Sequence, residues 1–168
     1  ALPSSADGID PASRLLAEAL PAKLGHSVAD LGAGWGYLSR QILTHAEVEE
    51  LHLVEANHDA LSCARRNVDD PRAQFHWADV RGWKAPGAMN AVVMNPPFHS
   101  GRSAEPELGQ AFITAAAAML TGSGSLWMVA NRHLPYEATL AERFVKVEEV
   151  EGDNRFKVLH ASRPKRLR

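Results

Sequence analysis

The chain contains a single cysteine, Cys63, so it cannot form an internal disulfide. No stretch reaches the roughly 20 uninterrupted apolar residues that a membrane-spanning helix needs. The first residues also lack the basic start and the long apolar run of a secretory signal. These absences favour a reducing compartment, and we expect a cytoplasmic protein with no membrane partner.

The overall composition of the chain is typical of one folded domain. The 168 residues are 45% hydrophobic and 23% charged, which excludes intrinsic disorder and predicts a single domain, residues 1–168, with a sizeable core. The net charge is −2, but the last fifteen residues hold six basic and no acidic residues, so the rest carries −8. We expect the basic tail, residues 163–168, either to contact a polyanion or to be an ordinary solvated terminus.

Short apolar runs alternate with helical patterns along the chain. Asp10 followed by Pro11 predicts the start of a helix within the N-terminal segment 8–23. Asn57 predicts the cap of another helix, and Gly122 predicts the end of a later one. Trp77 and Trp127 fall in strands and are expected in the core. Strands are predicted over residues 28–31, 51–55, 75–77, 91–94, 125–130, 145–150 and 155–160. The alternation predicts an α/β fold with a doubly wound, mostly parallel seven-stranded sheet and an antiparallel terminal strand.

A glycine-rich turn follows the first predicted strand. Its sequence, Gly-Ala-Gly-Trp-Gly over residues 32–36, permits positive φ and lets a ligand approach the backbone closely. Tyr37 stands where a dinucleotide fingerprint requires glycine or alanine, and this spacing is the one usual for S-adenosylmethionine. Glu55 ends the second strand, where an acid accepts ribose hydroxyls, and Asp79 follows the third, where it can accept from an adenine amino group. Together they predict a nucleotide-type cofactor site.

The fourth strand is followed by Asn95-Pro96-Pro97-Phe98. The prolines stiffen the backbone and keep its carbonyls out of a helix. The side-chain oxygen of Asn95 and the carbonyl of Pro96 can then accept both hydrogens of one planar NH₂ group and orient its lone pair for in-line methyl transfer. Phe98 offers a face on which a base can stack. These four residues are the predicted catalytic residues.

With these motifs the chain resembles class I S-adenosylmethionine-dependent amino-methyltransferases. It is most similar to the catalytic half of the ribosomal RNA guanine-N2 methyltransferases of the small subunit. Four stretches carry the resemblance: Gly8-Ile9-Asp10 with Ser13-Arg14-Leu15-Leu16; Asp30 to Gly34; Asn95 to His99; and Ala130 to Tyr136 with Arg155 to Val158. The resemblance implies a Rossmann-like methyltransferase fold, S-adenosyl-L-methionine as cofactor, ribosomal RNA or the small ribosomal subunit as partner, and no metal. Members typically carry a second domain before the catalytic one, so we expect a fragment or a single-domain relative.

The resemblance also assigns residues to each ligand. The implied cofactor-binding residues are Gly8, Asp10, Ser13, Asp30, Gly32, Ala33, Gly34, Glu55, Ala56, Asp79, Val80 and Asn95. The residues expected on the substrate side are His99, Arg132, His133 and Lys157.

Two alternative functions remain open from the sequence. Adenine N6 in nucleic acid or a glutamine amide in a protein also offers a planar NH₂ group, and the Asn-Pro-Pro-Phe motif does not distinguish these acceptors from guanine. The other alternative is a non-catalytic RNA-binding or assembly module that keeps the fold.

Overall fold

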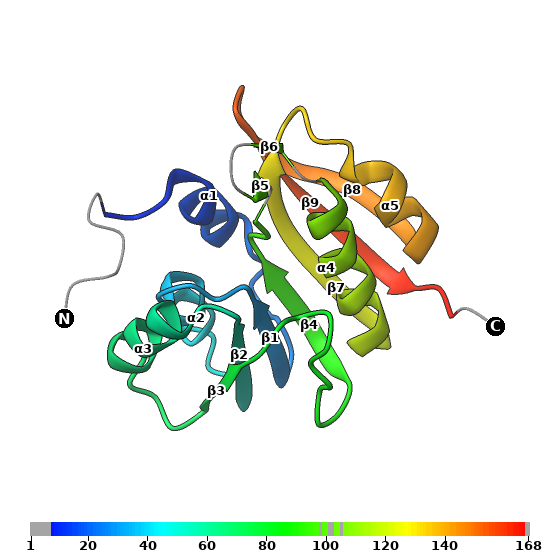
Figure 1. Cartoon of the computed structure of the whole chain (residues 1–168). Helices are drawn as coiled ribbons and strands as arrows, with labels where there is room; N and C mark the ends of the chain where they lie inside the picture. Colours follow the sequence, from blue (N-terminus) through cyan, green and yellow to red (C-terminus); the bar gives the residue numbers. More distant parts are fainter. Residues whose placement is uncertain (1–7, 98, 101–102, 105, 167–168) are drawn as a thin grey trace.

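A seven-stranded sheet forms the centre of the molecule (Figure 1). A computed structural model of the chain describes residues 8–97, 99–100, 103–104 and 106–166. The strands are β1 (Ser27–Leu31), β2 (Glu50–Glu55), β3 (Ala73–Trp77), β4 (Met89–Met94), β7 (Leu120–Asn131), β8 (Phe144–Gly152) and β9 (Phe156–Pro164), in the order β3-β2-β1-β4-β7-β9-β8. Neighbours from β3 to β7 are parallel, and β9 is antiparallel to both of its neighbours. The predicted α/β fold is confirmed.

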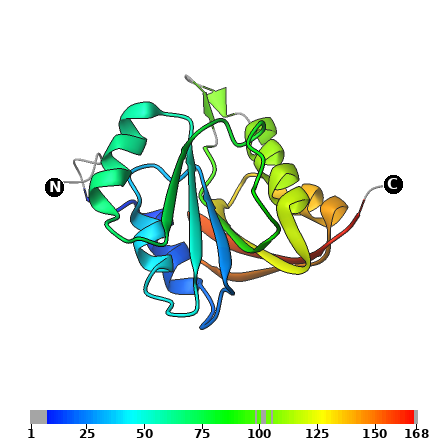
Figure 2. The ribbon, with the colours of Figure 1, turned by 90° about the horizontal axis from the view of Figure 1, so that it is seen from below.

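Helices cover both faces of this sheet (Figure 2). On one face lie α1 (Pro11–Ala19), α2 (Tyr37–Ile42) and α3 (His58–Asn67), and on the other lie α4 (Pro106–Met119) and α5 (Tyr136–Arg143). Each layer of helices packs on its own cluster of buried apolar side chains. Strands β1 and β4 are therefore buried on both sides, which explains their nearly continuous apolar sequences.

Two helix starts follow their predicted caps. Asp10 precedes α1, and its Oδ1 accepts a hydrogen bond from Ala12 N at 3.2 Å, with Pro11 at the first helical position. Asn57 precedes α3, and its Oδ1 accepts from Ala60 N at 2.9 Å. The first of these caps also places Asp10 at the edge of the sheet where β4 ends.

The prediction that Trp77 belongs to the core is wrong. Trp77 is the last residue of β3, which is the edge strand of the sheet, and it is 65% exposed. Its Nε1 donates to Ala56 O at 3.0 Å, and its ring meets His58 edge-on at 4.8 Å between centroids. An edge strand has no neighbour to cover one side, so an apolar residue at its end stays in contact with solvent.

The prediction that Gly122 ends a helix is also wrong. Helix α4 ends at Met119, and β7 begins at the next residue, so Gly122 lies within the strand. The end of α4 is capped from elsewhere in the chain, because Arg166 donates to Ala117 O at 3.3 Å and to the carbonyl oxygen of Leu120, the first residue of β7, at 2.6 Å. A second unpredicted feature is the short hairpin of β5 (His99–Ser100) and β6 (Ser103–Ala104) between β4 and α4.

None of the helices in the described ranges is long and apolar enough to cross a membrane.

The contact between α4 and α5 gives a stability prediction. Tyr136 is fully buried, and its ring and hydroxyl occupy the space where a Cβ on Gly109 would lie. Gly109→Ala gains up to about 1 kcal/mol of helix propensity, but overpacking costs about 1–3 kcal/mol. We expect a net loss of about 1 kcal/mol in the free energy of unfolding, measured by urea denaturation. Gly87→Ala, where no atom lies within 4 Å of the added Cβ, should be neutral; a stability unchanged by the first substitution would contradict this packing.

Candidate active site

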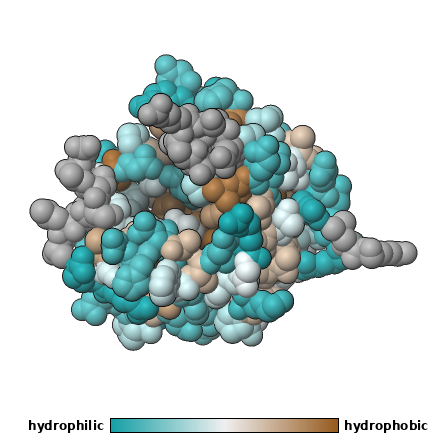
Figure 3. All heavy atoms as spheres, viewed as in Figure 1, coloured by the Kyte–Doolittle hydropathy of each residue, from teal (hydrophilic) through white to brown (hydrophobic). Residues whose placement is uncertain are grey.

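A cavity of about 340 Å³ lies at the edge of the sheet where parallel strands end. Figure 3 shows the molecular face hollowed near its centre, with apolar residues at the floor of the hollow. Six predicted cofactor residues line the cavity: Gly32, Glu55, Ala56, Asp79, Val80 and Asn95. Pro97, predicted as a catalytic residue, also lines it, and three further lining residues were not predicted: Arg81, Leu108 and Phe112. The ends of consecutive strands therefore converge on this cavity, as predicted, and apolar residues of α4 close it on one side.

The carboxylate of Glu55 is held rigidly in this cavity. Its Oε1 accepts from Gly34 N at 2.9 Å, and its Oε2 accepts from Asn57 N at 2.7 Å. Gly34 has φ +57°, a conformation that favours glycine and points its N–H at the acid. Each oxygen keeps a free lone pair, so the carboxylate can accept hydrogen bonds from two neighbouring hydroxyl groups.

Asp30 lies beneath the glycine turn and is fully buried. Its Oδ2 accepts from Ser39 Oγ at 2.7 Å, whereas Oδ1 has no hydrogen-bond partner within the described ranges. The pKa of Asp30 is raised to about 7: burial is the main cause and the charge of Glu55 adds to it, while the hydrogen bond from Ser39 acts in the opposite direction. Asp30 does not line the cavity, so its carboxyl group supports the turn from below.

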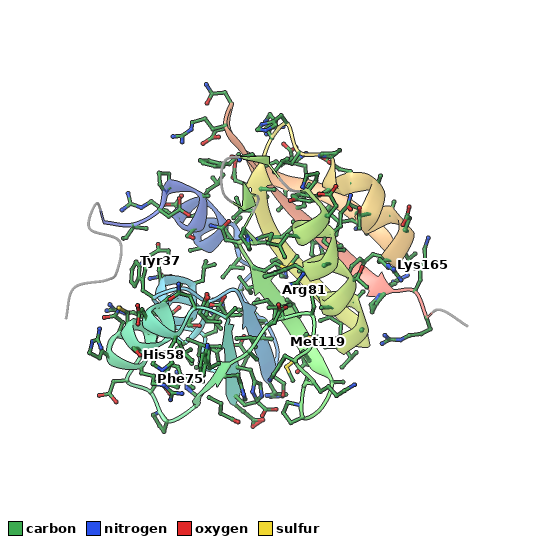
Figure 4. All side chains as sticks on the ribbon, viewed as in Figure 1. Tyr37, His58, Phe75, Arg81, Met119 and Lys165 are labelled. Carbon is green, nitrogen blue, oxygen red and sulfur yellow. The ribbon has the colours of Figure 1, made fainter. Side chains whose placement is uncertain are left out.

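Asp79 forms a closed ion pair with Arg81. Its Oδ1 accepts from Arg81 N at 2.8 Å and Nε at 2.9 Å, and its Oδ2 accepts from Arg81 Nη2 at 2.6 Å. These hydrogen bonds lower the pKa of Asp79 to about 2. Figure 4 shows Arg81 on the connection between β3 and β4, in front of the sheet. The pair keeps an ionised acceptor at this end of the cavity, and the Asp-x-Arg spacing is the sequence signal that could have identified Arg81.

A second cavity, of about 390 Å³, shares Asn95 and Pro97 with the first. Its other lining residues come from the segment after β4, from the region where α1 begins, from the end of β7, from α5 and from the region where β9 begins: Asp10, Ala12, Pro96, Ala130, Asn131, Tyr136, Arg155 and Phe156. Two cavities therefore meet at the segment that follows β4, where the sequence places the catalytic motif.

The amide of Asn95 is oriented by α1. Its Nδ2 donates to Asp10 Oδ2 at 2.8 Å and to Ser13 Oγ at 3.0 Å. A carboxylate only accepts hydrogen bonds, so the atom facing Asp10 must be the amide nitrogen. Within the described part of the chain no donor reaches Asn95 Oδ1. The amide oxygen is therefore a free acceptor at the boundary between the cavities.

Six lining residues of the second cavity were not predicted as site residues, and two of them, Tyr136 and Arg155, carry polar groups that can meet a ligand. Arg155 has its guanidinium group 4.9 Å from the ring centre of Phe156, and among the described residues this group forms no salt bridge, although its charge acts on nearby Asp153. The hydroxyl of Tyr136 is buried without a hydrogen-bond partner in the same part of the chain. Both residues lie in stretches that carry the family resemblance, so the motif was the available signal.

Lys157 does not support the predicted substrate contact. It is 4% exposed, and its Nζ donates to Leu134 O at 2.7 Å and to both carboxylate oxygens of Glu137 at 2.9 Å. An ammonium group has three donors, and all three are used inside the protein. The prediction of a substrate contact is therefore wrong: the side chain of Lys157 has a structural role and joins β9 to α5.

Two further predicted substrate residues, Arg132 and His133, lie outside both cavities. Arg132 donates to Glu149 Oε1 and Oε2, each at 3.0 Å, and to Asp153 O at 2.7 Å, which ties β7 to β8. His133 is exposed next to it. The structure describes His99 only as a residue of β5, and the predicted catalytic Phe98 lies outside the described residues.

Six predicted cofactor residues lie outside the lining of the first cavity: Gly8, Asp10, Ser13, Asp30, Ala33 and Gly34. Ala33 and Gly34 belong to the turn beside it, and Ser13 contacts Asn95. Gly8 lines a shallow depression on the outer side of α1, together with Arg14 and Asp153. The turn residues act through backbone geometry, whereas Gly8 is not brought to the cavity.

The basic tail is partly used by the fold. Lys165, labelled in Figure 4, donates from Nζ to Ala141 O at 2.9 Å, near the end of α5. Arg166 caps α4 in the same way. Cations at helix C-termini are favoured by the helix dipole, so these two residues of the tail stabilise helix ends.

Comparison with known proteins places these features in one family. Residues 4–160 match the family described as methyltransferase small domain. Ribosomal RNA large subunit methyltransferase G of Ectopseudomonas mendocina is 36% identical over 163 residues, which cover 94% of this chain and 43% of that protein. Ribosomal RNA small subunit methyltransferase C of Shewanella halifaxensis is 32% identical over 152 residues, covering 89% of this chain and 44% of that protein. The chain thus spans less than half the length of these curated relatives.

Solved structures agree with the fold and with the expected cofactor. The 16S rRNA N2 methyltransferase RsmC of T. thermophilus, in complex with AdoMet and guanosine, aligns with a TM-score of 0.80 and 30% identity, over 96% of this chain and 45% of that protein. The N-methyltransferase NodS of Bradyrhizobium japonicum, in complex with S-adenosyl-L-homocysteine, aligns over 91% of this chain and 85% of that one with a TM-score of 0.73 and 13% identity, a likeness of fold alone. The predicted resemblance and the Rossmann-like methyltransferase fold are confirmed.

Proposed function

We propose that this chain, which belongs to the methyltransferase small domain family, transfers a methyl group from S-adenosyl-L-methionine to the exocyclic N2 amine of a guanine in ribosomal RNA. The observation that carries the proposal is the meeting of two cavities at Asn95 and Pro97. One cavity has the acceptors that an adenosyl group needs, and the other is open to a base. A methyl group passing from one to the other crosses the boundary beside Asn95.

The first cavity fits the cofactor at several points. The rigid carboxylate of Glu55 accepts the two ribose hydroxyls, and the ionised Asp79 accepts from the adenine amino group. Ala56 and Val80 contribute apolar contacts to the adenine faces. When bound, S-adenosyl-L-methionine supplies the electrophilic methyl carbon. The residues of this chain hold the cofactor in a fixed position, and catalysis comes from the alignment of its methyl carbon with the acceptor amine.

The second cavity receives the base that is methylated. Asn95 Oδ1 and the carbonyl of Pro96 accept the two hydrogens of the amine, so that its lone pair faces the methyl carbon and the developing positive charge is stabilised. Arg155 lines this cavity, its guanidinium group forms no salt bridge within the described ranges, and it suits a base with a carbonyl oxygen. Guanine has such an oxygen and adenine does not, so Arg155 favours guanine over adenine N6.

The relatives do not decide which ribosomal subunit is the substrate. Similar curated proteins are named for the large subunit as well as for the small one. The RsmC structure, with guanosine bound, supports guanine N2 as the acceptor. We retain the small-subunit RNA as the first substrate to test, with large-subunit RNA beside it.

Methyl incorporation into unmodified ribosomal RNA tests the proposal. The chain is incubated with labelled cofactor and with free small-subunit RNA, free large-subunit RNA or intact subunits, and the product is digested to nucleosides. We expect N2-methylguanosine from one of these substrates. N6-methyladenosine as the product, or binding of RNA without any methyl transfer, would contradict the proposal and favour the alternative acceptor or a non-catalytic module.

The role of Glu55 gives a binding prediction. Glu55→Ala removes the acceptor of both ribose hydroxyls, and we expect the dissociation constant for S-adenosyl-L-methionine to rise roughly 30-fold, about 2 kcal/mol. Isothermal titration calorimetry measures this directly. Glu142→Ala, an exposed change on α5 outside both cavities, is the matched control. An affinity unchanged by Glu55→Ala would mean that the ribose binds elsewhere.

A further inference from the structure

A hydrogen-bonded triangle joins the start of α1 to the segment after β4. Its members are Asp10, Ser13 and Asn95, and the first and last are 85 residues apart in the sequence. Asn95 Nδ2 donates to Asp10 Oδ2 at 2.8 Å and to Ser13 Oγ at 3.0 Å, and Ser13 Oγ lies 3.3 Å from Asp10 Oδ2. The fold positions all three, because the Asp10 cap fixes the start of α1 and β4 delivers Asn95 to the sheet edge.

The donors and acceptors of this triangle allow only one arrangement. The carboxylate of Asp10 has no hydrogen to give, so both of its contacts inside the triangle are accepted. The hydroxyl of Ser13 gives its hydrogen to Asp10 and accepts from Asn95 with a lone pair. Both hydrogens of the Asn95 amide are therefore engaged, and Oδ1 points away from α1.

We propose that Asp10 and Ser13 are positioning residues that hold the Asn95 amide with its oxygen towards the acceptor amine. The proposal rests on the proposed function, in which Asn95 Oδ1 accepts a hydrogen from the substrate. Without Asp10 the amide can turn by 180° and present its own NH₂ group to the amine, so that two donors face each other. The negative charge of Asp10 also polarises the amide and makes Oδ1 a stronger acceptor. The family resemblance implied that Asp10 and Ser13 bind the cofactor, whereas in this proposal they hold Asn95.

Asp10→Asn tests this arrangement with little change of shape. Asparagine is a good N-cap, but its single acceptor oxygen cannot serve both Ala12 N and Asn95 Nδ2. If that oxygen caps α1, the new NH₂ group faces the Asn95 NH₂ group and turns the Asn95 amide around. By analogy with the loss of one transition-state hydrogen bond, we expect kcat to fall roughly 100-fold, with an unchanged dissociation constant for S-adenosyl-L-methionine.

The reciprocal exchange Asp10→Asn with Asn95→Asp distinguishes positioning from a structural role. In Asn95→Asp alone, two carboxylates face each other at the 2.8 Å contact and activity is expected to fall. In the double variant, the amide at position 10 donates to the carboxylate at position 95, whose second oxygen again faces the acceptor amine. We expect the kcat of the double variant to be at least tenfold higher than that of either single variant. A full kcat in Asp10→Asn, or a double variant no more active than the single ones, would overturn the proposal.

Two further measurements keep the result interpretable. Asp70→Asn is the matched control, because Asp70 Oδ1 accepts from Arg72 N two residues on, as Asp10 does from Ala12 N, but it lines neither cavity; its kcat should not change. The side-chain amide hydrogens of Asn95, assigned in NMR spectra by their loss in Asn95→Ala, should be protected from exchange in the wild type and unprotected in Asp10→Asn. If the wild type fails to methylate guanine, the proposed function is wrong, and these amide signals still decide the positioning proposal, since equal protection in both proteins would refute it.

Discussion

Replacing Asn95 by alanine is expected to reduce kcat for methyl transfer roughly 1,000-fold. The variant lacks the oxygen that accepts a hydrogen bond from the amine, and this hydrogen bond is strongest in the transition state. The loss falls on kcat since Asn95 Oδ1 acts on the reacting nitrogen, while Glu55 and Asp79 hold the cofactor from the other end of the first cavity. The dissociation constant for S-adenosyl-L-methionine should therefore change much less than the rate. Single-turnover transfer of labelled methyl to ribosomal RNA measures the effect.

The control for this variant is Gln74→Ala, which removes another amide from an exposed position on β3 outside both cavities. It should transfer methyl groups at the rate of the wild type. If Asn95→Ala were equally active, the amine would have to be held by other groups, and the segment after β4 would lose its catalytic assignment.

Asp30 is expected to make the stability of the ligand-free chain fall as pH rises. Burial raises its pKa from 3.8 to about 7 in the folded chain. A raised folded-state pKa of an acid stabilises the fold below the unfolded value, and this contribution is lost as pH rises through the folded value. Three pKa units correspond to about 4 kcal/mol. Relative to Asp30→Asn, the free energy of unfolding of the wild type should fall by up to about 4 kcal/mol between pH 4 and pH 8.

Urea unfolding of both proteins across this pH range measures the difference. The amide in Asp30→Asn adds a constant offset, because its new NH₂ group is buried, so the pH dependence carries the result. Asp70→Asn serves as the opposite case: hydrogen bonds from Arg72 lower the pKa of Asp70, and the wild type should gain stability relative to that variant as pH rises through the acidic range. Parallel curves for the wild type and Asp30→Asn would show that Asp30 is not buried as a carboxyl group.

The parts of the fold that local sequence determines could be predicted well. Strands β1 and β4 are nearly continuous apolar runs because helices cover both of their faces, and such runs are visible without a structure. The caps Asp10 and Asn57 predict the starts of their helices, because each forms a hydrogen bond with a backbone N–H only two or three residues away. Trp77 was misplaced because its exposure depends on which strand forms the edge of the sheet, and strand order is not a local property.

The convergence of residues at the candidate site could be predicted from the sequence only in part. The residues at strand ends converge as expected, since parallel strands deliver their carboxyl ends to one edge. The link between Asp10 and Asn95 could not be seen, because it joins distant parts of the chain through one side-chain contact. Arg155 and Lys157 show the same limit: the first lines the second cavity and the second is buried against Glu137, and only the tertiary fold decides which basic residue meets the substrate.

A crystal structure of the chain with S-adenosyl-L-homocysteine and guanosine would test most directly whether the amine is methylated at Asn95. The exocyclic N2 of guanosine should lie within hydrogen-bond distance of Asn95 Oδ1, with the base in the cavity lined by Asn131 and Arg155 and the sulfur of the cofactor product on the opposite side. A base bound outside that cavity, or an Asn95 amide whose nitrogen faces the base, would contradict this mechanism.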